Sequence, residues 1–292
     1  MEIKINFVKY RKVYYIFSGI LILLSLISLV SFGLKPGIDL AGGSIVDLNF
    51  KDSRPSNEQI EEKLKDFNLG EIVIQPVGDK EVIIRTKDIS EATHQEILKK
   101  FEGVEERSFE SIGPTIGNEL KQKTKSAMIL ALLAIAGYVA FAFRKVSWPV
   151  SSWKYGLATL IALFHDIIIP LGLFAYLGKA HNVEITIPII AAILTILGFS
   201  VHDTIVIFDR IRENILKRRS QSFEEIVNLS LNQTLGRSIN TVLTVMFVVL
   251  SLFFFGGETL RYFSLALIIG TISGAYSSIF IASSLLVTWL KK

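Results

Sequence analysis

Ionisable side chains inside apolar runs are the residues of this sequence that could do chemistry. Two His-Asp pairs, His165-Asp166 and His202-Asp203, stand within long runs of hydrophobic residues. On insertion scales an ionisable group costs at least about 2.5–3.5 kcal/mol at the centre of a membrane helix, so such residues are rare without a role. A carboxyl group in that medium could exchange its proton near neutral pH. The two pairs therefore predict a site that takes up and releases protons inside a membrane.

Two further polar residues extend this candidate relay. Arg237 stands at the cytoplasmic end of a later apolar run, at a depth from which its side chain could reach toward Asp203, and Thr241 follows on the same helical face. Adjacent residues of a helix point about 100° apart, so we expect the histidine and the aspartate of one pair to face different partners. The alternative interpretation of each pair is a polar contact that holds neighbouring helices together.

The apolar runs themselves predict a polytopic, α-helical membrane protein. The chain has 292 residues, of which 50% are hydrophobic. A bilayer is crossed by roughly 20 apolar residues, and runs near this length occur at 13–32, 127–143, 157–177, 185–208, 239–255 and 262–290. The first run is longer than the apolar core of a signal peptide and no small-residue cleavage site follows it, so we expect an uncleaved first span.

Basic residues set the expected orientation. They precede the first span, follow the second and cluster between the fourth and fifth, which by the positive-inside rule makes both termini cytoplasmic and residues 35–125 extracytoplasmic. The residues counted are Lys4, Lys9, Arg11, Lys12, Arg144, Lys145, Lys154, Arg210, Arg212, Lys217, Arg218, Arg219, Arg237, Lys291 and Lys292. This bias accounts for the net charge of +4, so nothing indicates a nucleic-acid partner. The absence of cysteine excludes disulfides and thiolate chemistry, and no pattern indicates a metal site or a cofactor.

The chain divides into three parts: 1–34 with the first span, 35–125 as a small α+β domain, and 126–292 with the other five spans. Within the domain, Ser56 and Gln59 predict a capping box at the start of a helix. Alternating and helical patterns predict a βαββαβ order, typical of a ferredoxin-like sandwich, with strands at 44–50, 72–74, 82–84 and 104–111 and helices at 56–67 and 90–101.

Three smaller features of the domain also carry expectations. Gly78-Asp79 predicts a tight hairpin between the second and third strands. His94 is expected to be a solvent-exposed residue of the second helix. The glycine-rich segments 37–43 and 112–117 are expected to be turns that join the domain to the membrane part, because the GxxxxGK[ST] pattern of a phosphate site is missing.

Small residues and breakers shape the expected helix bundle. Gly270, Gly274 and Ser278 stand four residues apart in the sixth span, a spacing that lets a neighbouring helix approach closely. Pro170 is expected to kink the third span just beyond its aspartate. A second capping box, Ser222–Glu225, predicts an amphipathic cytoplasmic helix before the fifth span.

Several motifs together resemble the SecD/SecF family of protein-export membrane proteins, within the resistance–nodulation–division (RND) superfamily. The resemblance extends nearly from end to end of the chain, and it is most specific in the fourth and fifth of the matching stretches. These stretches are GIDLAGG at 37–43, GPTIG at 113–117, ALFHD at 162–166, HDTIVIFDRIREN at 202–214, NQTLGRS at 232–238 and GAYSSIFIA at 274–282. Within the first stretch the chain reads Leu40-Ala41 where the family has Phe-Thr.

The resemblance implies a six-helix half of an RND-type bundle in the cytoplasmic membrane, with SecD as the partner that supplies the other half. It further implies a complex that uses the proton or sodium gradient to help export preproteins engaged by the SecYEG channel and the SecA ATPase, with room for other small membrane subunits. In the family, the motif aspartate and arginine that correspond to Asp203 and Arg237 form the relay pair. The expected relay also includes Thr241, Asp166, His165 and His202.

Three other interpretations stay open at this stage. An RND-type exporter of small molecules or lipids would share the fold, although such chains usually carry both halves. An intramembrane aspartyl protease could use Asp166 and Asp203, but the Gly-x-Gly-Asp arrangement is missing, and we expect no enzyme. A purely structural subunit that stabilises its partner predicts that changing Asp203 has no effect.

Overall fold

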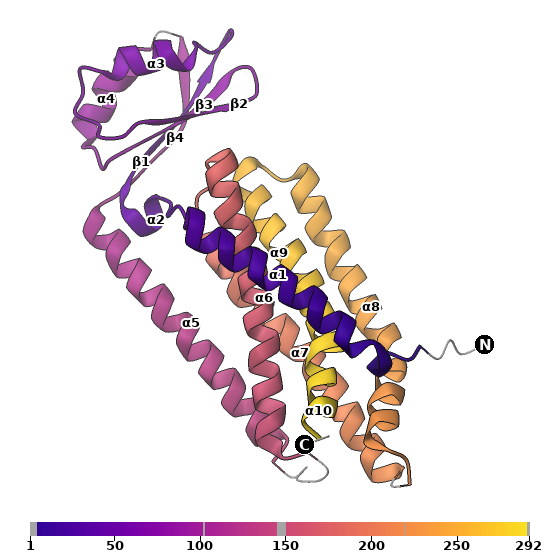
Figure 1. The fold of residues 1–292 in the computed structure, drawn as a ribbon. Coiled ribbons are helices and arrows are strands. Elements are labelled where there is room, and N and C mark those ends of the chain that lie inside the picture. Colours follow the sequence, from indigo (N-terminus) through magenta and orange to yellow (C-terminus); the bar gives the residue numbers. More distant parts are fainter. Residues whose placement is uncertain (1–4, 102, 145–149, 219, 291–292) are drawn as a thin grey trace. The chain divides into compact units, whose positions relative to one another are not determined.

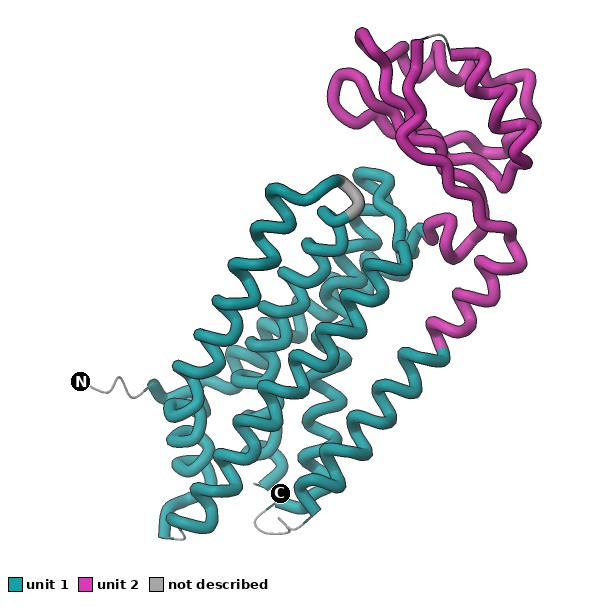
Figure 2. The backbone as a smooth tube through the Cα atoms, turned by 180° about the vertical axis from the view of Figure 1, so that it is seen from behind, with its two compact units in different colours: residues 1–35, 126–292 teal, residues 36–125 magenta. Residues whose placement is uncertain are grey.

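The computed structural model describes residues 5–101, 103–144, 150–218 and 220–290. Five basic residues used to predict the orientation, Lys4, Lys145, Arg219, Lys291 and Lys292, lie outside the described residues. The chain forms two compact units, one of Met1–Lys35 with Ser126–Lys292 and one of Pro36–Lys125 (Figure 2). Each unit has its own architecture.

The smaller unit is a four-stranded antiparallel sheet with two helices, and the predicted βαββαβ order is confirmed. The sheet order is β2-β3-β1-β4, the order of a ferredoxin-like sandwich. Its elements are β1 (Gly43–Phe50), α3 (Asn57–Leu64), β2 (Val73–Val77), β3 (Glu81–Thr86), α4 (Glu91–Lys99) and β4 (Val104–Ile112). Ser56 forms the predicted capping box with Gln59 at the start of α3.

Alternation along the strands builds the core of this unit. Val46 and Leu48 of β1 and Ile84 of β3 are buried together with Ile60 of α3 and Ile97 of α4. Because strand side chains alternate between the two faces, the residues between them lie on the opposite face of the sheet. The helices therefore cover one face of the sheet.

The expectation that His94 is solvent-exposed is wrong. Only 2% of the residue is exposed, and its ring stacks on Phe109 of β4 at 3.8 Å between ring centroids. Its two ring nitrogens lie 3.3 Å from Glu91 and 3.1 Å from Glu106. The physical reason is that His94 stands three residues before Ile97, so both side chains point from the same face of α4 toward the sheet.

The two glycine-rich segments at the base of this unit pack against each other. The first contains α2 (Ile38–Ala41), a short helix where the sequence predicted only a turn. Gly42 follows with φ of 81°, and a Cβ atom there would lie 2.7 Å from the Cα of Pro114. A Cβ atom on Gly117 would lie 2.6 Å from the backbone nitrogen of Gly42. Backbone thus contacts backbone at this point, which explains why glycine is required on both sides.

The larger unit contains the six predicted membrane spans (Figure 1), which makes the chain a multi-pass membrane protein. The spans are α1 (Arg11–Phe32) with the short η1 (Val8–Tyr10) before it, α5 (Pro114–Ala142), α6 (Ser152–His181), α7 (Ile187–Lys217), α8 (Phe223–Phe255), and a sixth made of α9 (Glu258–Tyr276), the π-helical η2 (Ser277–Ala282) and α10 (Ser283–Leu290). Buried residues are concentrated in α6, α7 and the sixth span, whereas α1, α5 and α8 expose most of their surface.

The helix expected before the fifth span is present, and it is continuous with that span. The capping box of Ser222 and Glu225 is present, but it starts α8 itself, which continues without a break to Phe255. No proline stands between the amphipathic and the apolar parts, so the backbone hydrogen bonds continue through both. The helix α6 likewise runs through Pro170.

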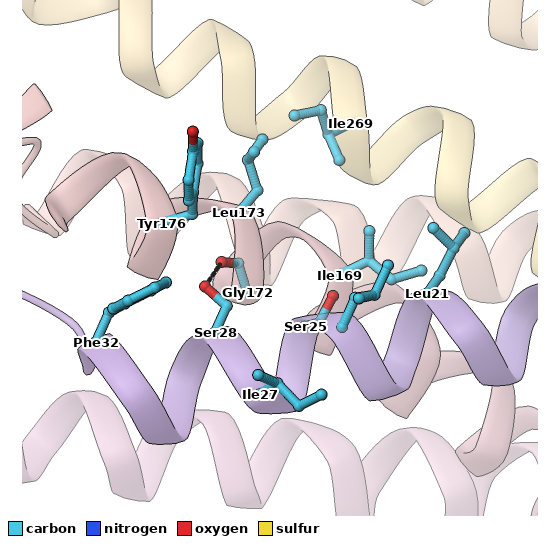
Figure 3. A pocket seen from close by; sticks show the side chains of 11 residues that line it. Leu21, Ser25, Ile27, Ser28, Phe32, Ile169, Gly172, Leu173, Tyr176 and Ile269 are labelled. Carbon is cyan, nitrogen blue, oxygen red and sulfur yellow. Dashed lines mark hydrogen bonds between the residues drawn. The ribbon is translucent and has the colours of Figure 1, made fainter. Parts of the chain in front are cut away.

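α1 packs closely against α6 where both helices carry small residues. Figure 3 shows Ser28 donating a hydrogen bond to the backbone oxygen of Gly172, at 2.7 Å. A Cβ atom on Gly172 would lie 2.3 Å from the Cβ and 2.4 Å from the Cα of Ser25. Beside this crossing, Phe32, Leu173 and Ile269 help to line an apolar groove of about 440 Å³.

Gly172→Ala is expected to destabilise the larger unit, because the added methyl group meets backbone of α1 and has to push two helices apart. Overpacking of this kind costs typically about 1–3 kcal/mol. The measurement is the thermal midpoint of the purified protein in detergent. Gly19→Ala in α1, where a Cβ atom meets nothing within 4 Å, is the control and should keep the midpoint. Equal midpoints for both variants would contradict the close contact.

Asp47→Asn is expected to stabilise the smaller unit at pH 7 and not at about pH 3. Burial raises the pKa of the Asp47 carboxyl, Glu81 raises it further, and Arg107 lowers it. The folded pKa of Asp47 exceeds its unfolded value of about 3.9. The stability that the neutral Asp47 side chain contributes is therefore complete below the unfolded pKa and is lost as the pH rises through the folded pKa. Asparagine cannot ionise, so it keeps this stability at pH 7. Urea unfolding at both pH values, read by proteolysis of residues 36–125, measures the effect. The exposed Asp52→Asn is the control, and an equal gain at both pH values would contradict the prediction.

Candidate functional site

Asp203 on α7 is a buried carboxyl group with one satisfied and one unsatisfied oxygen. The residue is 8% exposed. Its Oδ1 accepts a hydrogen bond of 2.6 Å from the Ser238 hydroxyl of α8. Its Oδ2 is buried and has no hydrogen-bond partner among the described residues. Buried polar atoms are normally paired, so an unpaired carboxyl oxygen marks a position where a proton or another cation can bind.

The other expected relay residues of this region lie on the surface of the chain. His202 and Arg237 are exposed and Thr241 is half-buried. The Thr241 hydroxyl donates to the backbone oxygen of Arg237 at 3.0 Å. Within the described part of the chain, no hydrogen bond or ion pair joins Arg237 to Asp203. The predicted contact between these two side chains is therefore not formed. The reason is rotation about α8: Ser238 points to α7, and its neighbour Arg237 therefore points elsewhere.

Polar residues form an exposed stripe along both helices of this site. On α7, Thr195 and His202 are exposed; on α8, Arg237, Asn240 and Thr244 are exposed. These positions lie in the two spans joined by the Asp203–Ser238 hydrogen bond. Polar groups in contact with lipid tails are costly, whereas polar groups between helices are common. We name this surface the α7–α8 polar stripe.

Asp166 on α6 is in the opposite situation, since both its oxygens are fully engaged. His165 Nδ1 lies 2.9 Å from Oδ1, and Ser273 donates to the same oxygen at 3.1 Å. Ser200 and Ser277 donate to Oδ2 at 2.6 and 2.7 Å. Asp166 is 1% exposed. One carboxyl group thus connects α6, α7 and the sixth span, and neither oxygen is free to take a further partner.

The expectation that the histidine and aspartate of one pair face different partners holds for one pair and is wrong for the other. His202 is exposed while Asp203 is buried. In the other pair, the Ser273 hydroxyl lies 3.1 Å from Asp166 and 3.3 Å from His165. Both side chains are long enough to bend toward one hydroxyl group, and both are fully buried, so the 100° difference in direction is overcome.

The small residues of the sixth span lie against α7. A Cβ atom on Gly270 would lie 2.0 Å from the Ile196 Cδ1, and one on Gly274 would lie 2.9 Å from the Ser200 Cβ. The Ser278 hydroxyl lies 2.7 Å from that of Thr204 and 3.2 Å from the backbone oxygen of Ser200. The spacing of four thus coincides with a close helix contact that also contains hydrogen bonds.

The sequence patterns used above did not identify the hydroxyl groups that bind the two aspartates or that join α7 to the sixth span beside them. Ser200 and Thr204 on α7, and Ser273 and Ser277 in the sixth span, are each four residues apart within apolar runs. A spacing of four places both residues of each pair on one helical face. This spacing is the feature of the sequence from which their contacts could have been predicted. Ser238 stood at the end of a noted motif, but its direction could not be read from the sequence. Among the residues that the structure describes, no three His, Cys, Asp or Glu side chains gather to hold a metal ion.

Comparison with family models finds two matches. The model of the protein export membrane protein SecD/SecF, C-terminal, matches residues 93–292. The model of the SecD/SecF GG motif matches residues 27–53, the region of the glycine segment that precedes β1.

Relatives and solved structures agree with these matches. Protein translocase subunit SecF of Thermobaculum terrenum is 45% identical, over 99% of this chain and 95% of its own length. The SecF subunit of Rhodothermus marinus is 41% identical, over 96% and 92%. A crystal structure of SecDF, a translocon-associated membrane protein from Thermus thermophilus, is 33% identical with a TM-score of 0.86, and a super-membrane-facing form of SecDF gives 0.71. Both solved structures are matched over 99% of this chain, which spans 39% of each solved chain.

Asp166→Ala is expected to lower the thermal midpoint of the purified protein more than Asp203→Ala. The first change leaves three serine hydroxyls and one imidazole nitrogen without their acceptor, and each unsatisfied buried group costs about 1–3 kcal/mol. The second change removes one hydrogen bond together with an oxygen that had no partner. Thermal unfolding in detergent at equal protein concentration measures both variants. A midpoint that falls equally, or further for Asp203→Ala, would contradict this assignment.

Proposed function

The chain belongs to the SecD/SecF family of protein export membrane proteins, and we propose that it serves protein export as an accessory subunit driven by an ion gradient through Asp203. The observation that carries the proposal is the buried, unpaired Oδ2 of Asp203 beside a hydroxyl donor on the next helix. A carboxyl group so placed can gain and lose a proton, or bind a sodium ion, without breaking its one existing hydrogen bond. Thr241 and His202 line the surface through which the ion would pass.

A second membrane protein covers the α7–α8 polar stripe in this proposal. Arg237, Asn240 and Thr244 are exposed along a membrane span, and a charged group in lipid costs at least about 2.5–3.5 kcal/mol. The chain spans 39% of the solved SecDF chain, so a SecD-type protein is the natural source of the missing half. Its helices would exclude lipid from Arg237 and cover the α7–α8 polar stripe beside Asp203.

The proposed location is the cytoplasmic membrane, with both termini in the cytoplasm and residues 35–125 outside it. The distribution of basic residues supports this orientation, because Arg11, Lys154, Arg210 and Arg218 all lie at the end of the bundle that carries the α7–α8 loop. The proposed partners are SecD, the SecYEG channel with SecA, and the preprotein in transit. The names of the relatives favour this reading over an exporter of small molecules or lipids.

The driving force is of the right size for a mechanical role. One proton that moves through a membrane potential releases about 2.3 kcal/mol per 100 mV. A conformational equilibrium with a gap of a few kcal/mol is therefore shifted by one or a few protons. In the proposed cycle, protonation of Asp203 changes the packing of α7 against α8, and this change is transmitted to the outer unit that holds the preprotein.

Asp203→Asn is expected to remove the stimulation of export and leave the protein folded, because the amide cannot exchange a proton but keeps an acceptor for Ser238. The measurement is a pulse-chase of a secreted preprotein in cells that lack their own subunit. These cells are complemented with this chain and its SecD at matched membrane levels.

Asp209→Asn is the matched control for this experiment. It makes the same chemical change six residues further along α7, where the carboxylate is exposed and pairs with Arg212. Export at the wild-type rate is expected for this variant. Wild-type export by Asp203→Asn as well would refute the proposed ion coupling and leave a structural role for the aspartate.

A further inference from the structure

The cytoplasmic half of α8 carries a stripe of polar residues that face the start of the chain. Glu224, Asn228 and Asn232 are spaced by four residues, which places them on one side of the helix. Residues 5–11, called the N-terminal segment below, lie along this side. The stripe includes the first residue of the NQTLGRS motif, for which the relay supplies no role.

The two asparagines bind the main chain of the N-terminal segment. Asn232 accepts from the Ile5 backbone N–H at 2.9 Å and donates to the Ile5 oxygen at 2.8 Å. Asn228 accepts from the Phe7 N–H at 2.8 Å and donates to the same Ile5 oxygen at 3.1 Å. An amide side chain offers one acceptor and two donors, so it can pair with a backbone as a neighbouring strand would. These hydrogen bonds are made to backbone atoms, so they do not depend on the Ile5 side chain.

Side chains in the middle of the N-terminal segment and at its C-terminal end strengthen the attachment. Phe7 and Val8 are buried, 4% and 0% exposed. The Phe7 ring packs on Phe280 of η2 at 5.9 Å between centroids. Arg11 forms an ion pair with Glu224 at 3.0 Å. The segment therefore fills the space between α8 and the π-helical part of the sixth span.

A second set of contacts fixes the opposite side of α8 to the end of α7. Gln233, the second residue of the motif, accepts from Arg210 at 2.7 Å and from Asn214 at 2.8 Å. Asn214 also donates to Ser230 at 2.8 Å. Five residues beyond Gln233, roughly 7–8 Å along the helix, Ser238 donates to Asp203. The two helices are thus held in one antiparallel register from their cytoplasmic ends up to the candidate site.

The membrane half of α8 packs along α9 but buries few side chains. The buried residues of this helix lie between Phe223 and Ser238, with Val249 as the exception. Contacts one to four turns nearer the start of α8 therefore contribute to the depth and rotation of Ser238 and Arg237.

We propose that Asn228, Asn232 and Gln233 are positioning residues that set the register of α8 against α7 and so hold Ser238 at Asp203. This inference rests on the proposed function, because the register matters for export only if Asp203 exchanges an ion. In this proposal the N-terminal segment helps to position α8, because it connects α8 to the sixth span. The motif has two tasks: its first two residues fix the helix, and its last residue, Ser238, donates a hydrogen bond to Asp203.

The first experiment measures amide hydrogen exchange of the N-terminal segment in the purified complex with SecD. Asn228→Ala with Asn232→Ala should raise the exchange of the Ile5 and Phe7 amides, by at least about fivefold for each hydrogen bond lost. Ile5→Pro removes the backbone N–H that donates a hydrogen bond to Asn232, and it should release the N-terminal segment from α8. Ile5→Ala keeps that N–H and is the matched control. Unchanged protection in the asparagine variants would overturn the inference.

The second experiment asks whether the register matters to the site. Export into inverted membrane vesicles is measured as a function of pH for Gln233→Ala and Gln233→Glu. The alanine should move the midpoint of the pH profile, because Ser238 shifts against Asp203. The glutamate keeps an acceptor for Arg210 and Asn214 and should restore the wild-type profile. A purely structural contact would lower the yield of the complex without moving the midpoint.

Asp203→Asn, run beside these variants, distinguishes the two hypotheses. Loss of export in Asp203→Asn with wild-type pH profiles in the asparagine and Gln233→Ala variants would overturn the positioning role alone. Wild-type export in Asp203→Asn would refute the proposed function, and with it the reason for a register. Raised exchange together with a moved midpoint supports the inference.

Discussion

The carboxyl group of Asp166 is the interaction on which the membrane unit depends. A membrane interior offers no water to hydrogen-bond a buried carboxyl group, so every partner has to come from the protein. Three serine hydroxyls and one imidazole provide them, from α6, α7 and the sixth span. The small residues Gly270 and Gly274 allow the sixth span to come close enough to α7 for these hydroxyls to reach. Packing and polar contacts at this centre therefore require each other.

Asp203 differs from Asp166 in its number of partners, although both are buried aspartates preceded by histidine. A fully engaged carboxyl group stabilises one arrangement of helices, while a group with an unpaired oxygen can take a new partner. The two sites are connected, because Ser200 and Thr204 stand on α7 on either side of Asp203 and both contact the sixth span. A rigid centre next to an incomplete site is a suitable arrangement for a part that has to respond to an ion.

The surface of the chain indicates where the site is completed. Arg237 and Asn240 lie on the α7–α8 polar stripe, along spans that would otherwise contact lipid. The N-terminal half of α8 is held by hydrogen bonds to the N-terminal segment on one side and to α7 on the other. The membrane half of α8 packs along α9 and leaves many side chains exposed. In the proposed function the chain supplies one wall of the ion site, and a partner protein supplies the other.

The sequence by itself determined the six spans, the βαββαβ order and the buried aspartates, because hydrophobic length, alternation and capping are local properties of the chain. It did not determine directions. That Ser238 and not Arg237 faces Asp203, that His94 is buried under the sheet, and that Asn228 and Asn232 bind the start of the chain follow from contacts between residues far apart in the sequence. A helix presents a residue on every side, and only the packing of its neighbours decides which side becomes a site.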